Sequence, residues 1–112
     1  EVDIRLVDSK LFIGHDRAEE EIEIDLLLQH ADKLFIHCKN IESLLYLRPY
    51  NKLCIFGHAV DEFVLTSQLD VFCVMPELHT RKISGEELRI CQHVLTDFPY
   101  RYENEINNTP IR

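Results

Sequence analysis

The sequence predicts an α/β fold, and three observations lead to this prediction. Short apolar runs rich in Val, Ile and Phe alternate with segments that have a helical period. Continuous apolar runs of this length favour strands covered on both faces, as in a mostly parallel sheet. Polar residues follow five of the runs, at the strand ends where parallel sheets bind ligands. The expected strands are residues 2–7, 11–13, 34–36, 53–56, 63–65, 71–75 and 94–95.

The first two strands are predicted to form a hairpin that carries polar groups. Side chains alternate across a strand, so Glu1 and Asp3 point the same way. Asp8 and Ser9 supply turn chemistry that folds the next strand back. The return strand brings His15 toward the start of the first strand. Two carboxylates at this spacing suit a cation that prefers oxygen ligands.

The expected helices are short and few. Pro49 ends the expected helix at residues 41–47, and Ser84 with Glu87 forms a capping box at the start of a later helix. The predicted N-caps are Asp25 for residues 26–31, Asn40 for 41–47 and Ser84 for a helix to about residue 92. We expect one domain, residues 1–102, and a loose polar tail at residues 103–112.

Size and charge limit the classes of function. A chain of 112 residues with 46% hydrophobic content supports one modest core. The net charge of −8 argues against nucleic acid as a partner, because phosphate binding needs a basic face. No apolar run is long enough to span a bilayer, and no secretory leader stands at the start. The chain begins with Glu rather than Met, so we expect the natural protein to extend upstream.

The four cysteines predict a reducing compartment rather than a disulfide framework. Cys38, Cys54 and Cys73 lie within apolar runs, and none of the four forms a C-x-x-C pair. We interpret them as small buried hydrophobes of a cytoplasmic protein, not as zinc ligands.

Further candidates follow the middle strands. His37 and Lys39 share a face beyond residues 34–36, where the lysine could neutralise a phosphate. His58 and Glu77 follow two other runs. Each candidate also has a structural interpretation: Glu1 and Asp3 as a solvated strand face, His15 and Asp16 as loop residues, His37 and Lys39 as structural polar groups, and His58 with Asp61 as a hydrogen-bonded pair.

Taken together, these segments resemble the glycerophosphodiester phosphodiesterase family, within the superfamily that includes phosphatidylinositol-specific phospholipase C. Glu1-Val-Asp3 followed by His15-Asp16 is similar to the family's E-x-D strand and its H-D pair. His37-Cys-Lys39-Asn40 and Thr96-Asp97-Phe-Pro99 are similar to two later strand ends. The H-x-K-N pattern with a later Leu65-Thr66-Ser67 is most similar to a shortened bacterial subgroup.

This resemblance implies a TIM-type (β/α) barrel and metal-dependent hydrolysis of a phosphodiester. Glu1, Asp3 and His37 would hold Mg²⁺, Ca²⁺ or Mn²⁺. His15 would act as general acid or base and Lys39 would stabilise charge on the phosphoryl group. Arg5, His58 and Glu77 would contact the small-molecule substrate.

Three departures qualify what the resemblance implies. The family's first strand, with its second catalytic histidine, is missing before Glu1. An acidic third ligand is replaced by His37, which suits Mn²⁺ or Zn²⁺ better than Mg²⁺ or Ca²⁺. A full barrel needs at least about 200 residues, so we expect a partial or degenerate barrel, whose open apolar edges favour self-association or instability.

Two other classes of function stay open at this point. One is a non-catalytic relative that binds a phosphorylated ligand or a protein partner. The other is an interaction domain unrelated to the family.

Overall fold

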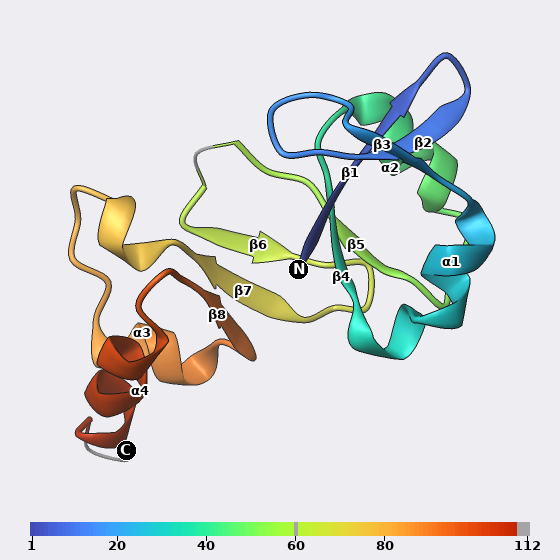
Figure 1. Cartoon of the computed structure of the whole chain (residues 1–112). Coiled ribbons are helices and arrows are strands. Elements are labelled where there is room, and N and C mark those ends of the chain that lie inside the picture. Colours follow the sequence, from blue (N-terminus) through green and yellow to red (C-terminus); the bar gives the residue numbers. More distant parts are fainter. Residues whose placement is uncertain (60, 110–112) are drawn as a thin grey trace. The chain divides into compact units, whose positions relative to one another are not determined.

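The computed structural model describes residues 1–59 and 61–109, and the chain divides into two compact units. The first unit comprises residues 1–59 and 66–68, and the second comprises the described residues 61–65 and 69–109. Figure 1 labels their helices and strands. Each unit has its own sheet. The sequence, in contrast, predicted a single domain from residue 1 to residue 102.

The first unit contains a five-stranded mixed sheet in the order β3-β2-β1-β4-β5. Strand β1 pairs antiparallel with β2, which pairs antiparallel with β3; β1, β4 and β5 run parallel. The elements are β1 Val2–Val7, β2 Lys10–Ile13, β3 Glu20–Ile22, α1 Ile24–Gln29, the 3₁₀ helix η1 Ala31–Lys33, β4 Phe35–Cys38, α2 Ile41–Leu47 and β5 Cys54–Phe56.

One face of this sheet forms the core of the first unit. The buried residues Ile4, Ile36 and Ile55 pack with Leu27 of α1 and Leu47 of α2. Because side chains alternate along a strand, the residues between them point to the opposite face. The polar side chains of β1 therefore lie away from the helices.

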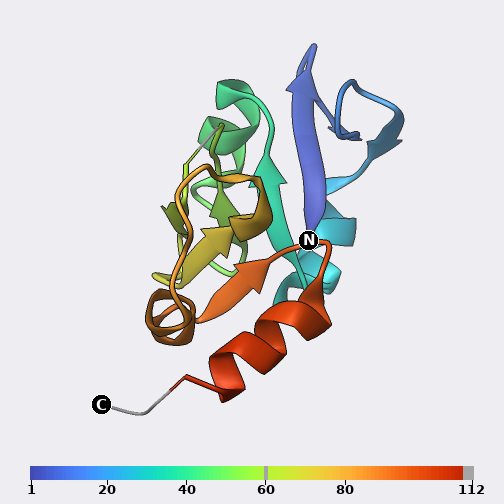
Figure 2. The same ribbon diagram turned by 90° about the vertical axis from the view of Figure 1, so that its left-hand side faces the viewer.

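The second unit contains the three-stranded sheet β6-β7-β8 and two packed helices. Strand β6 is antiparallel to β7, and β7 is parallel to β8. Its core includes Cys73, Ile83, Leu88 and Tyr102. Figure 2 shows α4 in red. The elements are β6 Phe63–Leu65, β7 Val71–Val74, the 3₁₀ helix η2 Pro76–Leu78, α3 Gly85–Ile90, β8 His93–Leu95 and α4 Pro99–Asn107.

Several local predictions are confirmed. Asp8 and Ser9 both have positive φ and join β1 to β2 in the two-residue hairpin. The Asn40 side chain accepts a hydrogen bond from the Ser43 amide and caps α2. Ser84 and Glu87 form the capping box of α3. Local chemistry was sufficient for these features.

The predicted TIM-type barrel is wrong. The strands form two mixed sheets of five and three strands, and neither closes into a barrel. A parallel neighbour requires a long crossover connection, whereas β2, β3 and β7 each follow a short connection and pair antiparallel with the strand before them.

Two helices also differ from expectation. Helix α1 begins at Ile24 after Glu23, so Asp25 lies in its first turn rather than at its N-cap. Residues 103–107, expected to be loose, continue α4, whose Tyr102 is buried. The last three residues of the expected tail lie outside the described residues. Within the described chain, every helix is too short or too polar to cross a membrane.

Candidate functional site

Three side chains from β4 and the start of the chain converge on the polar face of the first sheet. Glu1, Asp3 and His37 each place a ligand atom within 4.8 Å of the others. Parallel pairing puts Asp3 directly beside His37, and the period of two puts Glu1 on the same face as Asp3. The sheet register therefore assembles this group, which we call the Glu1–Asp3–His37 cluster.

The His37 ring is held firmly inside the first unit. His37 is 5% exposed, and its ring stacks on Phe56 at 5.1 Å and on His58 at 4.2 Å between centroids. Phe56 is the β5 neighbour of His37 in register, and His58 follows two residues later. The ring presents Nδ1 to Asp3, with 3.3 Å between Nδ1 and Oδ1.

The electrostatics of the cluster leave the imidazole neutral. Burial, followed by the nearby His58 and Lys39, lowers the pKa of His37 to about 4. Partial burial of the Glu1 carboxyl, with its hydrogen bond and charge contact to Asp3, raises the pKa of Glu1 to about 7. Near neutral pH the Glu1 carboxyl is therefore partly protonated and lies beside a neutral imidazole.

The cluster also contains polar atoms that the described protein does not satisfy. Within the described residues, buried Nε2 of His37 makes no hydrogen bond of normal geometry, and buried Oδ1 of Asp3 faces Nδ1 of His37 at 3.3 Å without forming one. Buried polar atoms are normally paired, so such atoms call for an explanation. Two carboxylates and a neutral imidazole are a donor set for a divalent cation. The residues therefore fit a metal ion on chemical grounds.

Lys39 lies near the cluster. Its amide donates to the Ile4 carbonyl at 2.9 Å and continues the pairing of β1 with β4. Its positive charge lowers the pKa of both Glu1 and His37. The sequence placed Lys39 on the face of His37, and these electrostatic contacts agree with that placement.

The backbone just before His15 lies next to Asp3 of the Glu1–Asp3–His37 cluster. The Gly14 amide donates to the Asp3 carbonyl at 3.1 Å, so His15 directly follows the last pairing of β2 with β1. Its side chain is exposed, and Nδ1 lies 2.8 Å from Oδ1 of Asp16. His15 is not one of the three residues of the cluster.

Arg5 fastens the loop that carries His15. Its guanidinium donates to the carbonyl of Gly14 at 3.2 Å and to that of His15 at 2.6 Å. A Cβ at Gly14 would overlap the carbonyl oxygen of Arg17, so this close backbone approach requires glycine. Arg5, expected to contact substrate, therefore has a structural role in positioning this loop.

Glu77 also has structural partners. It lies in the second unit, where its carboxylate accepts hydrogen bonds from Thr96 Oγ1 at 2.7 Å and from the Asp97 amide at 3.1 Å. Despite partial burial, these hydrogen bonds keep the pKa of Glu77 below its ordinary value. The contacts explain Glu77 without a substrate. His58, the third residue expected to bind substrate, forms the stack on His37.

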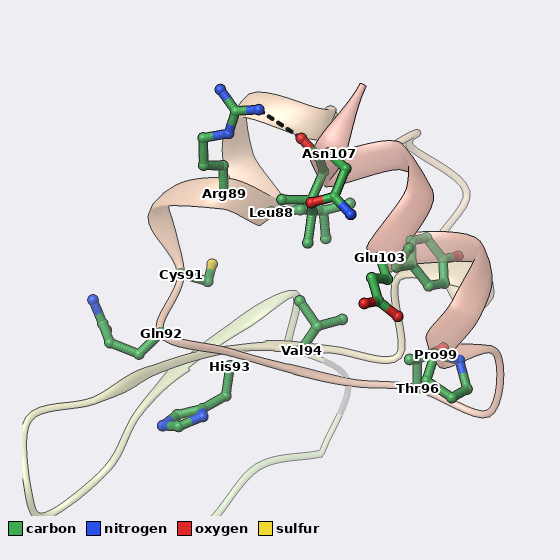
Figure 3. A pocket seen from close by; sticks show the side chains of 12 residues that line it. Leu88, Arg89, Cys91, Gln92, His93, Val94, Thr96, Pro99, Glu103 and Asn107 are labelled. Carbon is green, nitrogen blue, oxygen red and sulfur yellow. Dashed lines mark hydrogen bonds between the residues drawn. The ribbon is translucent and has the colours of Figure 1, made fainter. Parts of the chain in front are cut away.

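Sequence reasoning did not find a pocket in the second unit. A cavity of about 410 Å³ lies between α3, β8 and α4, lined in part by Leu88, Val94 and Tyr102 (Figure 3). Arg89 at its edge donates to the Ile106 carbonyl at 2.6 Å. The lining residues come from three elements, and part of the last lies in the segment expected to be a loose tail, so no motif indicates the cavity.

No family model, curated protein or solved structure matches this chain. The resemblance to glycerophosphodiester phosphodiesterases therefore stays a prediction from motifs, and functional inference depends on the geometry of the first unit.

Proposed function

We propose that this protein is a divalent-metal-dependent phosphodiester hydrolase of the glycerophosphodiester phosphodiesterase type. The observation that carries the proposal is the convergence of Glu1, Asp3 and His37, with the charge of Lys39 beside them. A cation held by Glu1, Asp3 and His37 would supply Lewis-acid stabilisation to a phosphoryl oxygen.

The residues around the cluster have separate tasks in this proposal. Lys39 would bind the anionic phosphoryl group and stabilise the charge that develops on it. Asp16 faces Nδ1 of His15, which leaves Nε2 as the atom that would donate a proton to the leaving oxygen. Arg5 would hold His15 within reach by anchoring its carbonyl.

The charge of the chain favours a small substrate. A net charge of −8 opposes binding of a polyanion, while a bound cation would mask the carboxylates that face a single phosphodiester. A glycerophosphodiester meets this requirement because it carries one negative charge.

The test is hydrolysis of glycerophosphocholine and glycerophosphoethanolamine by the 112-residue chain with Mg²⁺, Mn²⁺ or Ca²⁺ present. We expect metal-dependent release of the alcohol that a chelator stops. Replacing His15 by Ala should lower the rate at least about 100-fold, because general acid–base catalysis contributes about that much. His30→Ala, an exposed histidine on the same unit, is the matched control and should keep the rate. Absence of turnover with all three metals, or full activity in Asp3→Asn, would contradict the proposal.

One observation favours a second candidate, a non-catalytic protein that binds a phosphorylated ligand. The His15 side chain pairs with Asp16 and stands outside the cluster. Glycerol 3-phosphate with Mn²⁺ would then raise the Tm, since a ligand of the folded state stabilises it, while no diester is cleaved. Turnover that depends on His15 would rule this candidate out.

A further inference from the structure

The metal preference of the Glu1–Asp3–His37 cluster can be inferred from its donors. Two of the three donors are carboxylate oxygens and the third is an imidazole nitrogen. Mg²⁺ and Ca²⁺ prefer oxygen ligands, whereas imidazole binds the later first-row divalent cations more strongly. Among the described residues, no third carboxylate joins this group to replace the imidazole.

The imidazole cannot readily move aside for an ion that prefers oxygen. The rings of Phe56 and His58 stack nearly parallel to it, with interplanar angles of 10° and 12°. The His37 side chain is 7% exposed and that of Asp3 is 14% exposed. Mg²⁺ retains several waters and Ca²⁺ takes six to eight oxygens, and this half of the cluster offers little solvent access.

We infer that this site selects a transition-metal dication such as Mn²⁺ or Co²⁺ over Mg²⁺ and Ca²⁺, and that His37 determines the preference. The inference rests on the proposed function only for the presence of a metal there. It adds the class of cation and the residue that sets it. The stacked, buried imidazole acts as a fixed nitrogen ligand, while Glu1 and Asp3 balance the double positive charge.

The primary test is calorimetric titration of the 112-residue chain with Co²⁺, Mn²⁺, Mg²⁺ and Ca²⁺, with no substrate present. We expect Co²⁺ to bind at least about tenfold more tightly than Mg²⁺, with Mn²⁺ between them. NMR of the Co²⁺ form should show strongly shifted ring protons for His37 and unshifted ones for the exposed His30. Equal affinity for Co²⁺ and Mg²⁺ would overturn the inference without any variant.

Two substitutions test the role of His37. His37→Asp supplies an oxygen donor and should reverse the order, so that Mg²⁺ and Ca²⁺ gain affinity and Co²⁺ loses it. His37→Gln retains a neutral side chain with an oxygen donor and should lower Co²⁺ affinity about tenfold or more while changing Mg²⁺ affinity much less. His37→Gln is the variant to use if the added buried charge of His37→Asp prevents folding. His30→Gln is the matched control, and an unchanged preference in the folded His37 variants would overturn the assignment.

The outcomes separate this inference from the proposed function. A chain that binds Co²⁺ in preference to Mg²⁺ but cleaves no diester refutes the hydrolase and supports the metal assignment. A chain that hydrolyses diesters but binds Co²⁺ and Mg²⁺ equally supports the hydrolase and refutes the assignment.

Discussion

The two units of this protein differ in how completely their polar side chains are hydrogen-bonded. In the second, the charged residues that hold loops and helix ends have partners: Arg81 bonds Glu62 and Glu87, and Glu77 bonds Thr96 and Asp97. In the first, buried Oδ1 of Asp3 and Nε2 of His37 lack a hydrogen bond of normal geometry among the described residues, although Oδ1 lies 3.3 Å from Nδ1 of His37.

This difference separates structural polar groups from functional ones. A buried polar atom without a hydrogen-bond partner lowers the stability of the folded protein. Such an atom is expected at a functional site, where a bound ligand supplies the missing partner. The type of side chain does not distinguish the two kinds of group, because Glu77 and Asp3 are both acidic residues near strand ends. The hydrogen-bond partners of each side chain distinguish them.

The largest expected effect comes from Asp3→Asn. Metal affinity should fall at least about 100-fold, because the substitution removes a ligand rather than an outer partner. Metal-free stability should not fall, since the change also removes the like charge that crowds Glu1. Calorimetric metal titration and thermal melting with a chelator measure the two quantities.

The opposite result would make Asp3 a structural residue like Glu77. A metal-free Tm lowered by more than about 4 °C, with metal affinity retained, would contradict the distinction between the units.

A smaller effect is expected from Glu77→Gln in the second unit. The free energy of unfolding should fall by about 1–3 kcal/mol, because the hydrogen bonds to Thr96 and the Asp97 amide lose their charge. Metal affinity should stay unchanged. Glu103→Gln, an exposed residue of α4, is the control and should change stability by less than about 0.5 kcal/mol in denaturant melts.

The smallest effects are opposite responses to pH. The pKa of Glu1 is raised to about 7, so its contribution to stability is present below pH 4.5 and is lost as pH rises through 7. The pKa of Glu87 is lowered to about 2, mainly by its hydrogen bonds to Arg81, so its contribution is present above 4.5 and is lost as pH falls through 2.

Carboxyl NMR titration measures these two groups separately. Global stability is less informative for the first unit, because His37, with its pKa lowered to about 4, opposes Glu1 between about pH 4.5 and 6.5. We expect Arg81→Gln to raise the pKa of Glu87 and to leave Glu1 unaffected. Coincident titration of Glu1 and Glu87 near pH 4.5 would remove the electrostatic contrast.

The sequence was sufficient where structure depends on neighbours along the chain. The hairpin at Asp8 and Ser9 and the cap at Asn40 follow from local turn and capping chemistry. The pairing of Glu1 with Asp3 followed from the strand period. His37 was included from a motif, although only the β1–β4 register shows why it meets Asp3.

Long-range pairing was not predictable in this way. The barrel failed because sheet closure depends on which distant strands pair, and short connections selected antiparallel partners instead. The stacking of His58 on His37 required the β4–β5 register. Helix α4 was missed in a polar segment, although Tyr102 and Ile106, four residues apart, indicated its packed face.

The central claim is that Glu1, Asp3 and His37 bind one divalent cation, and Mn²⁺ line broadening tests it most directly. Substoichiometric Mn²⁺ added to the ¹⁵N-labelled chain should broaden the amide signals of residues 2–4 and 36–38 most strongly. The broadening should disappear in Asp3→Asn. Strongest broadening at any other part of the chain, or the same pattern in Asp3→Asn, would contradict the claim.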